Sequence, residues 1–205
     1  MSYIFESYQQ KYSDSELRNI FNITSSPLYD YSITCDGLTV PGTPYDLIYK
    51  NPTSMWFSKI YTYGWLIFDF QSKPMTITGY RILATIGCCT LKNHYLKGSN
   101  DGVNWLEITH ITSNTPNLNR VNWVNYEVSE STFRMYKIEE EQSYLGTSCN
   151  RDQFFGLRKV DFLVTKLCDF MNRDHLKAVK ISIVCFHSNF FQVLFIISAH
   201  SFTYY

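Results

Sequence analysis

Several features of nucleic-acid-binding and secreted proteins are missing from this chain of 205 residues. Lys and Arg together number 18, as do Asp and Glu, and no basic excess in the middle of the chain would attract a polyanion at long range. We therefore expect no nucleic-acid partner. The N-terminal sequence MSYIFESYQQKYSDSE lacks a basic segment followed by an apolar run. Without a signal peptide, we expect a cytoplasmic location and reduced cysteines.

The sequence also lacks the spacings that metal sites and catalytic centres require. None of the six cysteines forms a C-x-x-C pair, and no histidine follows them at zinc-finger distance. The five histidines avoid i, i+4 spacing, and no G-x-S-x-G motif is present. Asp69 and Asp161 follow apolar strand residues, where bonding to backbone amides is a simpler role than half of an acid pair. We predict no metal, no cofactor and no enzyme activity.

Aromatic residues, in contrast, are abundant. The chain has 16 Tyr and 15 Phe, a composition that favours strands. Apolar residues alternate as half-buried strands require at 64–70, 76–84, 122–128 and 157–164, and the segment 133–138 is rich in residues that favour strands. The connections carry Gly, Pro, Asn and Ser, and no long helical pattern lies between the strands. This order predicts an all-β sandwich rather than βαβ units.

One stretch, LKGSNDGVNWLEI at 96–108, has two interpretations: a loop that cradles phosphate or calcium, or a turn between strands. It matches neither phosphate-loop pattern nor the calcium-loop pattern. Asp101-Gly102 supplies the positive φ that a hairpin turn needs, and Asn and Ser side chains satisfy turn amides. The pattern favours a hairpin, with Trp105 packing the returning strand into the core. The acidic run at 139–141 is interpreted as a solvated loop after a strand.

The ordered motifs resemble the discoidin domain, also found at the C-terminal ends of coagulation factors V and VIII. The resemblance covers 19–164 and depends on the hairpin motif together with MWFS (55–58), ITGYRI (77–82), FRMYKI (133–138) and FFGLRKVDF (154–162). It implies a galactose-binding-like jelly-roll β-sandwich. The chain looks closest to intracellular protist members that often follow a BTB domain. His94 occupies an inward position where the family usually has Trp.

The resemblance also implies a non-enzymatic module that binds a carbohydrate or a protein surface through loops at one end of the sandwich. These loops correspond to 28–36, 58–64 and 86–93, and a further loop precedes the last strand. The candidate ligand-binding residues are Tyr29, Tyr31, Lys59, Tyr61, Tyr63, Lys92 and Arg151. A tyrosine ring offers a flat amphipathic face to a sugar or peptide, and Arg151 can donate two bonds to a carboxylate or to vicinal hydroxyls. The alternative is that the tyrosines pack on the core from strand ends.

The two ends of the chain differ from the central domain. Residues 1–18 are expected to form an N-terminal segment or linker, although SDSELRN could also cap a short helix. Residues 165–205 form an atypical apolar tail, and 181–205 contains no charged residue. The tail is a membrane anchor, a translated intron or read-through, or an apolar element docked on the sandwich; polar residues at 187–189 and 192 make the anchor less favoured. The alternative function is a structural adaptor in protein or membrane assembly, with the tail as its anchor.

Overall fold

The structure, a computed structural model, describes residues 2–25, 33–35, 38–40, 43–49, 56–58, 63–71, 74–84, 90–112, 122–144 and 156–165. These residues belong to one compact unit, Met1–Thr165. The predicted tail lies outside the described residues except for Thr165, and so do five of the seven candidate ligand-binding residues. Within the described ranges, no helix has both the length and the apolar character to cross a membrane. No group of three or more His, Cys, Asp or Glu in these ranges is placed to hold a metal ion.

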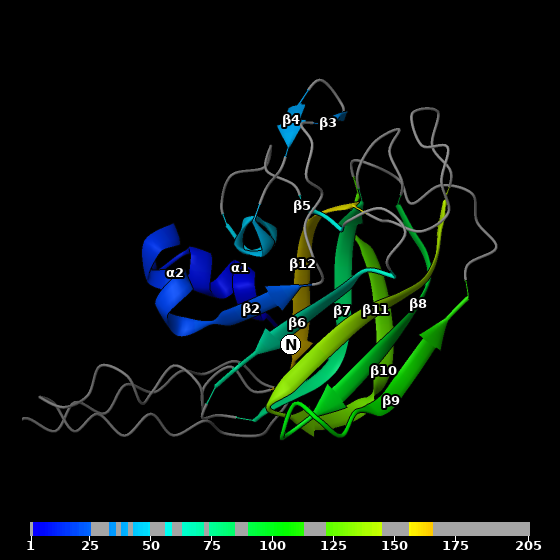
Figure 1. The fold of residues 1–205 in the computed structure, drawn as a ribbon. Coiled ribbons are helices and arrows are strands. Elements are labelled where there is room, and N and C mark those ends of the chain that lie inside the picture. Colours follow the sequence, from blue (N-terminus) through cyan, green and yellow to red (C-terminus); the bar gives the residue numbers. More distant parts are fainter. Residues whose placement is uncertain are drawn as a thin grey trace, which may run out of the picture. The chain divides into compact units, whose positions relative to one another are not determined.

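The described chain is predominantly β, as predicted (Figure 1). Its larger strands are β6 (Trp65–Asp69), β7 (Met75–Ala84), β8 (Thr90–Ser99), β9 (Leu106–Ile111), β10 (Val124–Phe133), β11 (Met135–Tyr144) and β12 (Gly156–Val164). Shorter strands are β1 (Ser2–Tyr3), β2 (Asn22–Ser25), β5 (Trp56–Phe57) and the separate hairpin β3 (Ile33–Cys35) and β4 (Leu38–Val40). The helical elements are α1 (Ile4–Gln9), α2 (Asp14–Ile20) and the 3-10 helix η1 (Pro44–Leu47).

The strands form two antiparallel layers. One layer has the order β10–β7–β12, with β1 and β5 also paired to β12. The other has the order β8–β11–β6–β2, with β9 paired to the free side of β8. Among the described strands, one parallel pair, Gly156 with Thr90, joins the layers. This arrangement is the predicted β-sandwich.

Aromatic and aliphatic side chains from both layers fill the core. The alternation predicted at 64–70, 76–84 and 157–164 corresponds to burial: Leu66, Phe68 and Phe70 of the β6 region, Tyr80, Ile82 and Ala84 of β7, and Val160, Phe162 and Val164 of β12 are all buried. His94 is also fully buried, as its predicted inward position requires. Alternate residues of β6 and β7 therefore face the core, as expected for period-two burial, whereas β12 is buried along most of its length.

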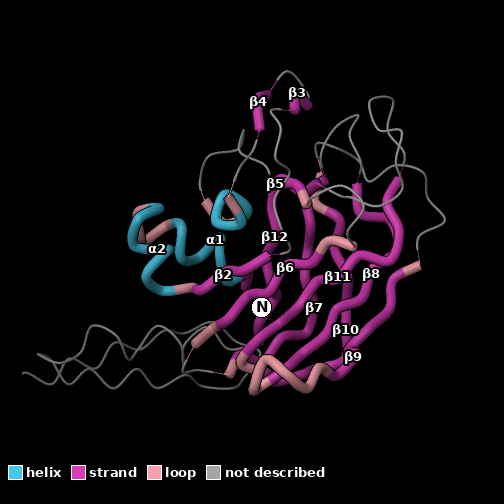
Figure 2. Tube along the Cα trace, viewed as in Figure 1, coloured by secondary structure: helices cyan, strands magenta, loops and turns pink. Residues whose placement is uncertain are grey.

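The N-terminal helices belong to the sandwich, which differs from the predicted segment or linker over 1–18. Phe5 of α1 lies 5.9 Å from Phe68 and 6.0 Å from Phe162, measured between ring centroids, so it contacts residues of both layers. Figure 2 shows both helices on the side of the sandwich that carries β2 and β12. The two helices are too short for a sustained apolar period, which is why the sequence pattern did not reveal them. The predicted cap is confirmed: Ser13 and Glu16 form a capping box at the start of α2.

The stretch 96–108 is a β8–β9 hairpin, as predicted. Gly102 has φ +77°, and its amide donates to Ser99 Oγ at 2.9 Å. Asp101 Oδ1 accepts from the amides of Val103 and Asn104, both at 2.8 Å. These bonds hold the pKa of Asp101 well below its usual range. The polar side chains of the turn thus satisfy the turn's own backbone.

The predicted core position of Trp105 is wrong. Its side chain is half-buried, and its Nε1 donates to the carbonyl of Gly102 at 3.1 Å. Lys137 Nζ lies 4.8 Å from the ring centroid. The turn extends from residue 100 to residue 105, so the chain has not yet re-entered the sheet at Trp105, and the ring covers the turn instead.

The acidic run at 139–141 is a strand rather than the predicted solvated loop. β11 continues to Tyr144, six residues beyond the predicted strand end at 138, and alternation along it separates the three carboxylates. Glu139 and Glu141 pair with lysine and histidine side chains on one face. Glu140 points the other way and is buried. Because the inward residue Glu140 is as acidic as its outward neighbours Glu139 and Glu141, the sequence shows no apolar–polar alternation at this point of the strand.

Candidate ligand-binding site

The loops predicted to bind ligand adjoin the end of the sandwich where β6 and β8 begin and β11 ends. Glu139 of β11 pairs with Trp65 of β6 on one side and with Tyr95 of β8 on the other. Tyr63, just before β6, and Lys92, near the start of β8, therefore lie on either side of β11 at this end. We refer to this region as the loop end.

Only Tyr63 and Lys92 of the predicted ligand-binding residues can be located. Tyr63 is 59 % exposed. Lys92 is half-buried and lies within β8, which begins at Thr90, rather than in the predicted loop 86–93. The other predicted residues, namely Tyr29, Tyr31, Lys59, Tyr61 and Arg151, lie outside the described residues. The register brings Tyr63 and Lys92 to the same end of one layer.

A buried carboxylate fixes the backbone beside Tyr63. The Gly64 amide donates to Glu140 Oε2 at 2.8 Å, and the Glu140 amide donates to the Gly64 carbonyl at 2.8 Å. The Ser143 hydroxyl donates to the other oxygen of Glu140. Burial raises the pKa of Glu140, while the bonds that its carboxylate accepts from Ser143 and from the Gly64 amide lower it. Glu140 was not a predicted site residue, but it positions the exposed tyrosine.

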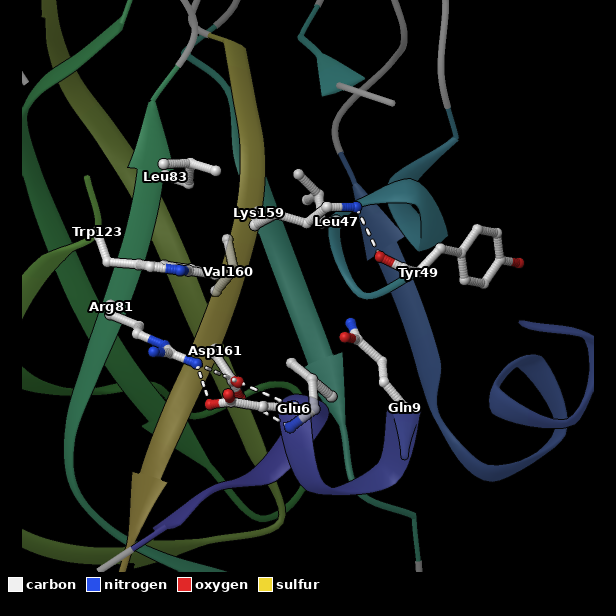
Figure 3. A pocket seen from close by; sticks show the side chains of 11 residues that line it. Glu6, Gln9, Leu47, Tyr49, Arg81, Leu83, Trp123, Lys159, Val160 and Asp161 are labelled. Atoms are coloured by element: carbon white, nitrogen blue, oxygen red, sulfur yellow. Dashed lines mark hydrogen bonds and ion pairs between the residues drawn. The ribbon is translucent and has the colours of Figure 1, made fainter. Parts of the chain in front are cut away.

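A second candidate region is a cavity of about 280 Å³ on another face of the sandwich (Figure 3). It lies among α1, the end of η1, the β7 and β12 strands, and the segment just before β10. The lining residues are Phe5, Glu6, Gln9, Leu47, Tyr49, Arg81, Leu83, Trp123, Lys159, Val160 and Asp161. We refer to it as the α1 cavity.

Arg81 forms one side of the α1 cavity, where aromatic rings and acids hold it. Its guanidinium carbon lies 3.5 Å from the ring centroid of Tyr3 and 4.2 Å from that of Trp123. Its NH2 group contacts Glu6 Oε2 at 2.6 Å and Asp161 Oδ2 at 3.4 Å. A planar guanidinium between two rings and two carboxylates has little freedom to move.

Asp161 links β12 to the start of α1. Its Oδ1 accepts from the Phe5 amide at 2.7 Å, and its Oδ2 accepts from the Glu6 amide at 3.0 Å. The Phe162 amide also donates to it, at 2.9 Å. Burial raises the pKa of Asp161 to about 6, and the backbone bonds and Arg81 oppose that rise. The predicted bonding of Asp161 to backbone amides is confirmed, although two of the amides come from the N-terminal helix.

Lys159 closes another side of the α1 cavity. Its Nζ donates to the carbonyls of Asp46 and Tyr49, both at 2.7 Å. Burial lowers the pKa of Lys159 to about 8. Figure 3 shows this ammonium group turned toward Tyr49, away from Arg81.

Few features of the sequence indicate the α1 cavity. Its residues come from α1, from Arg81, from Trp123 and from 159–161, which only the folded topology brings together. One signal was available: Arg81 is the one charged residue of β7, Asp161 is the one acidic residue of β12, and the two are paired in the β7–β12 register. Opposite charges at directly paired positions indicate an ion pair on one sheet face.

The two layers and their strand order define a class, the galactose-binding-like jelly-roll β-sandwich, as predicted. No family model matches this chain, and no curated protein matches it. Solved structures do match this chain, and the three described here are carbohydrate-binding modules. At these sequence identities the likeness establishes the fold, and membership of the discoidin family stays a prediction.

A family 32 module from Clostridium perfringens, in complex with GalNAc-β-1,3-galactose, has TM-score 0.55 and 11 % identity, covering 72 % of this chain and 97 % of that chain. A family 32 module of a family 31 glycoside hydrolase from the same organism has TM-score 0.56 and 9 % identity over 71 % and 92 %. The family 32 module of C. perfringens NanJ, in complex with galactose, has TM-score 0.51 and 12 % identity over 71 % and 94 %.

Proposed function

We propose that this chain is a non-catalytic carbohydrate-recognition module that binds its ligand at the loop end. The observation that carries the proposal is the fold: solved structures with the same sandwich include modules in complex with GalNAc-β-1,3-galactose and with galactose. A shared fold does not by itself determine a function, so the proposal also needs a site with suitable chemistry.

The chemistry of the loop end supports sugar binding. Tyr63 is exposed, while the next residue, Gly64, is held by two bonds to Glu140. An aromatic ring on a fixed backbone loses little entropy when it stacks on the apolar face of a sugar. We propose that Tyr29, Tyr31, Lys59, Tyr61, Lys92 and Arg151 complete this surface, with the cations and hydroxyls bonding to sugar hydroxyls.

A glycan array probed with the full chain tests this function. We expect Tyr61→Ala/Tyr63→Ala to reduce binding of the preferred glycans at least about tenfold, since each aromatic contact is worth roughly 1 kcal/mol or more. Val103→Ala is the matched control, because Val103 is 79 % exposed in the β8–β9 turn at the opposite end. Equal binding by the double variant and the control would refute the loop-end assignment, provided that both melt at the wild-type temperature.

Two alternatives have their own outcomes in this experiment. The same loops could recognise a protein surface, or the chain could act as an adaptor through residues 165–205. An array on which the wild-type chain binds no glycan rules out the carbohydrate proposal and favours these alternatives. Self-association that disappears when 166–205 are removed would then select the adaptor role.

A further inference from the structure

We propose that the α1 cavity is a second ligand site and that it takes a single neutral sugar ring. This inference goes beyond the proposed function, because it concerns a different face of the sandwich from the loop end. It depends on the size of the cavity, the pairing of its charges, the polar atoms left unpaired and the apolar walls.

The size of the cavity limits the ligand. Its volume of about 280 Å³ is just below the range of roughly 300–1,000 Å³ typical of small-molecule pockets. A space of this size suits one ring with its substituents. It does not suit a chain of several sugars enclosed along its length.

The charges around the cavity indicate a neutral ligand. Arg81 is paired with Glu6 and Asp161, and the Lys159 ammonium group bonds to two backbone carbonyls. The four charged side chains of the lining therefore already have partners within the protein, and their formal charges, two positive and two negative, cancel. An anion or cation entering the cavity would lose its hydration without finding an unpaired opposite charge.

Polar atoms that remain available match a ligand with hydroxyl groups. Arg81 Nε is buried and has no hydrogen-bond partner among the described residues. Glu6 is bonded to Arg81 through Oε2, and Gln9 is bonded to the Ile48 carbonyl through Nε2, which leaves a side-chain oxygen of each to accept a bond. Hydroxyl groups can both donate and accept, so one polyol can satisfy this mixed set. The unpaired Nε is also a group whose burial needs an explanation, which a ligand would supply.

The remaining walls are apolar and suit the C–H face of a ring. Trp123 lies between Arg81 and Leu83 in Figure 3, and Val160 and Leu47 continue the apolar surface. A pocket with aromatic and aliphatic walls and a few convergent polar groups is the usual form of a small-molecule site. A sugar ring has this combination of an apolar face and a polar rim.

Titration of the full ¹⁵N-labelled chain with a fixed panel of galactose, N-acetylgalactosamine, glucose, mannose and myo-inositol tests the proposal. Trp123→Phe assigns the Trp123 indole resonance among the chain's four tryptophans. We expect at least one panel member to shift the Trp123 indole and the Arg81 Nε–H resonances with saturation, and to leave Trp105 unchanged. The methyl α- and β-glycosides of a sugar that binds are titrated in the same way. Binding of a methyl glycoside would indicate that the natural ligand is the terminal residue of a glycan, and binding of the free sugar alone would indicate a free monosaccharide.

Two variants keep the test decisive. Leu83→Phe fills the cavity from a half-buried position and should weaken binding at least about tenfold. Gln9→Ala removes one acceptor and should weaken it severalfold; Val103→Ala is the control and should bind as the wild type does. Absence of any saturable Trp123 shift with the whole panel overturns the proposal, as does unchanged binding by a folded Leu83→Phe variant. The Tyr61→Ala/Tyr63→Ala variant should lose glycan-array binding but keep the saturable Trp123 shift. This result would show that the loop end and the α1 cavity bind independently.

Discussion

His94 is a buried imidazole surrounded by tyrosine rings. Its Nε2 lies 2.6 Å from the hydroxyl of Tyr80, and its ring meets Tyr126 edge to face at 5.3 Å. Burial lowers the pKa of His94 to about 3. The neutral ring can bond to the tyrosine hydroxyl, whereas a charged ring would be buried away from water, which disfavours the charged form.

This environment predicts acid sensitivity. The unfolded chain binds a proton at His94 below about pH 6.5, but the folded chain does so only near pH 3, so His94 lowers stability as pH falls through this window. The loss approaches about 1.4 kcal/mol for each pH unit. Tyr80→Phe/His94→Phe removes both partners of the buried bond, and urea unfolding at pH 7 and pH 4.5 should show about 2–3 kcal/mol less acid destabilisation than in the wild type.

Other titrating groups, including Asp161, are common to both proteins and cancel in that comparison. Tyr80→Phe alone is the control, because it keeps the imidazole and should keep the acid sensitivity. An identical pH dependence in the wild type and the double variant would contradict the assignment to His94.

Gly102 holds the turn of the β8–β9 hairpin at φ +77°. Gly102→Ala should destabilise the domain by about 1–2 kcal/mol, because an L side chain is strained in the left-handed region. Gly102→Asn should cost less, since asparagine tolerates this region better. Thermal unfolding measures both, and equal effects of the two substitutions would argue against backbone strain as the cause.

At the scale of single elements, Asp161 explains why α1 docks where it does. One carboxylate bonds two amides at the beginning of the helix and also contacts Arg81. The helix carries Phe5 into the core beside residues from both layers. A polar anchor in β12 and an apolar anchor in α1 together fix the helix on the sandwich.

Removing the polar anchor should loosen α1. Asp161→Ala leaves two helix amides without acceptors and removes one partner of Arg81, so we expect a loss of roughly 3 kcal/mol or more. Urea unfolding measures the loss, and hydrogen exchange should speed up most at Phe5 and Glu6. Glu6→Gln is the control, with an expected cost below about 1 kcal/mol, because the Glu6 side chain is 56 % exposed. Unchanged exchange at these amides in Asp161→Ala would show that α1 is held by packing alone.

The elements also show what the sequence could reveal. Strands β6, β7 and β12 were predictable because each has a buried face, and β10 because half-buried and exposed residues alternate along its first half. Strand β11 was predicted too short, because charged pairs occupy its outer face to Tyr144. Helices α1 and α2 were missed as parts of the domain, since α1 is buried through contacts with β12 and with Phe68, and α2 contacts α1, and no local pattern contains these contacts.

For the whole molecule, the sandwich separates two candidate binding regions. The loop end carries the exposed Tyr63 beside the buried Glu140, and the α1 cavity carries Trp123 and Arg81. The first region was predicted from the resemblance to the discoidin domain, which implies ligand-binding loops at one end of the sandwich. The second was not, because it exists only where an N-terminal helix meets strands that are distant in sequence.

Carbohydrate binding at the loop end can be measured by titrating the ¹⁵N-labelled full chain with GalNAc-β-1,3-galactose and with galactose. These two sugars are chosen because solved structures with this fold contain them. We expect saturable shifts at the amides of Gly64 and Lys92, and none at Val103 in the opposite turn or at Leu106 just after it. Shifts confined to that turn, or no shift with either sugar, would contradict this expectation.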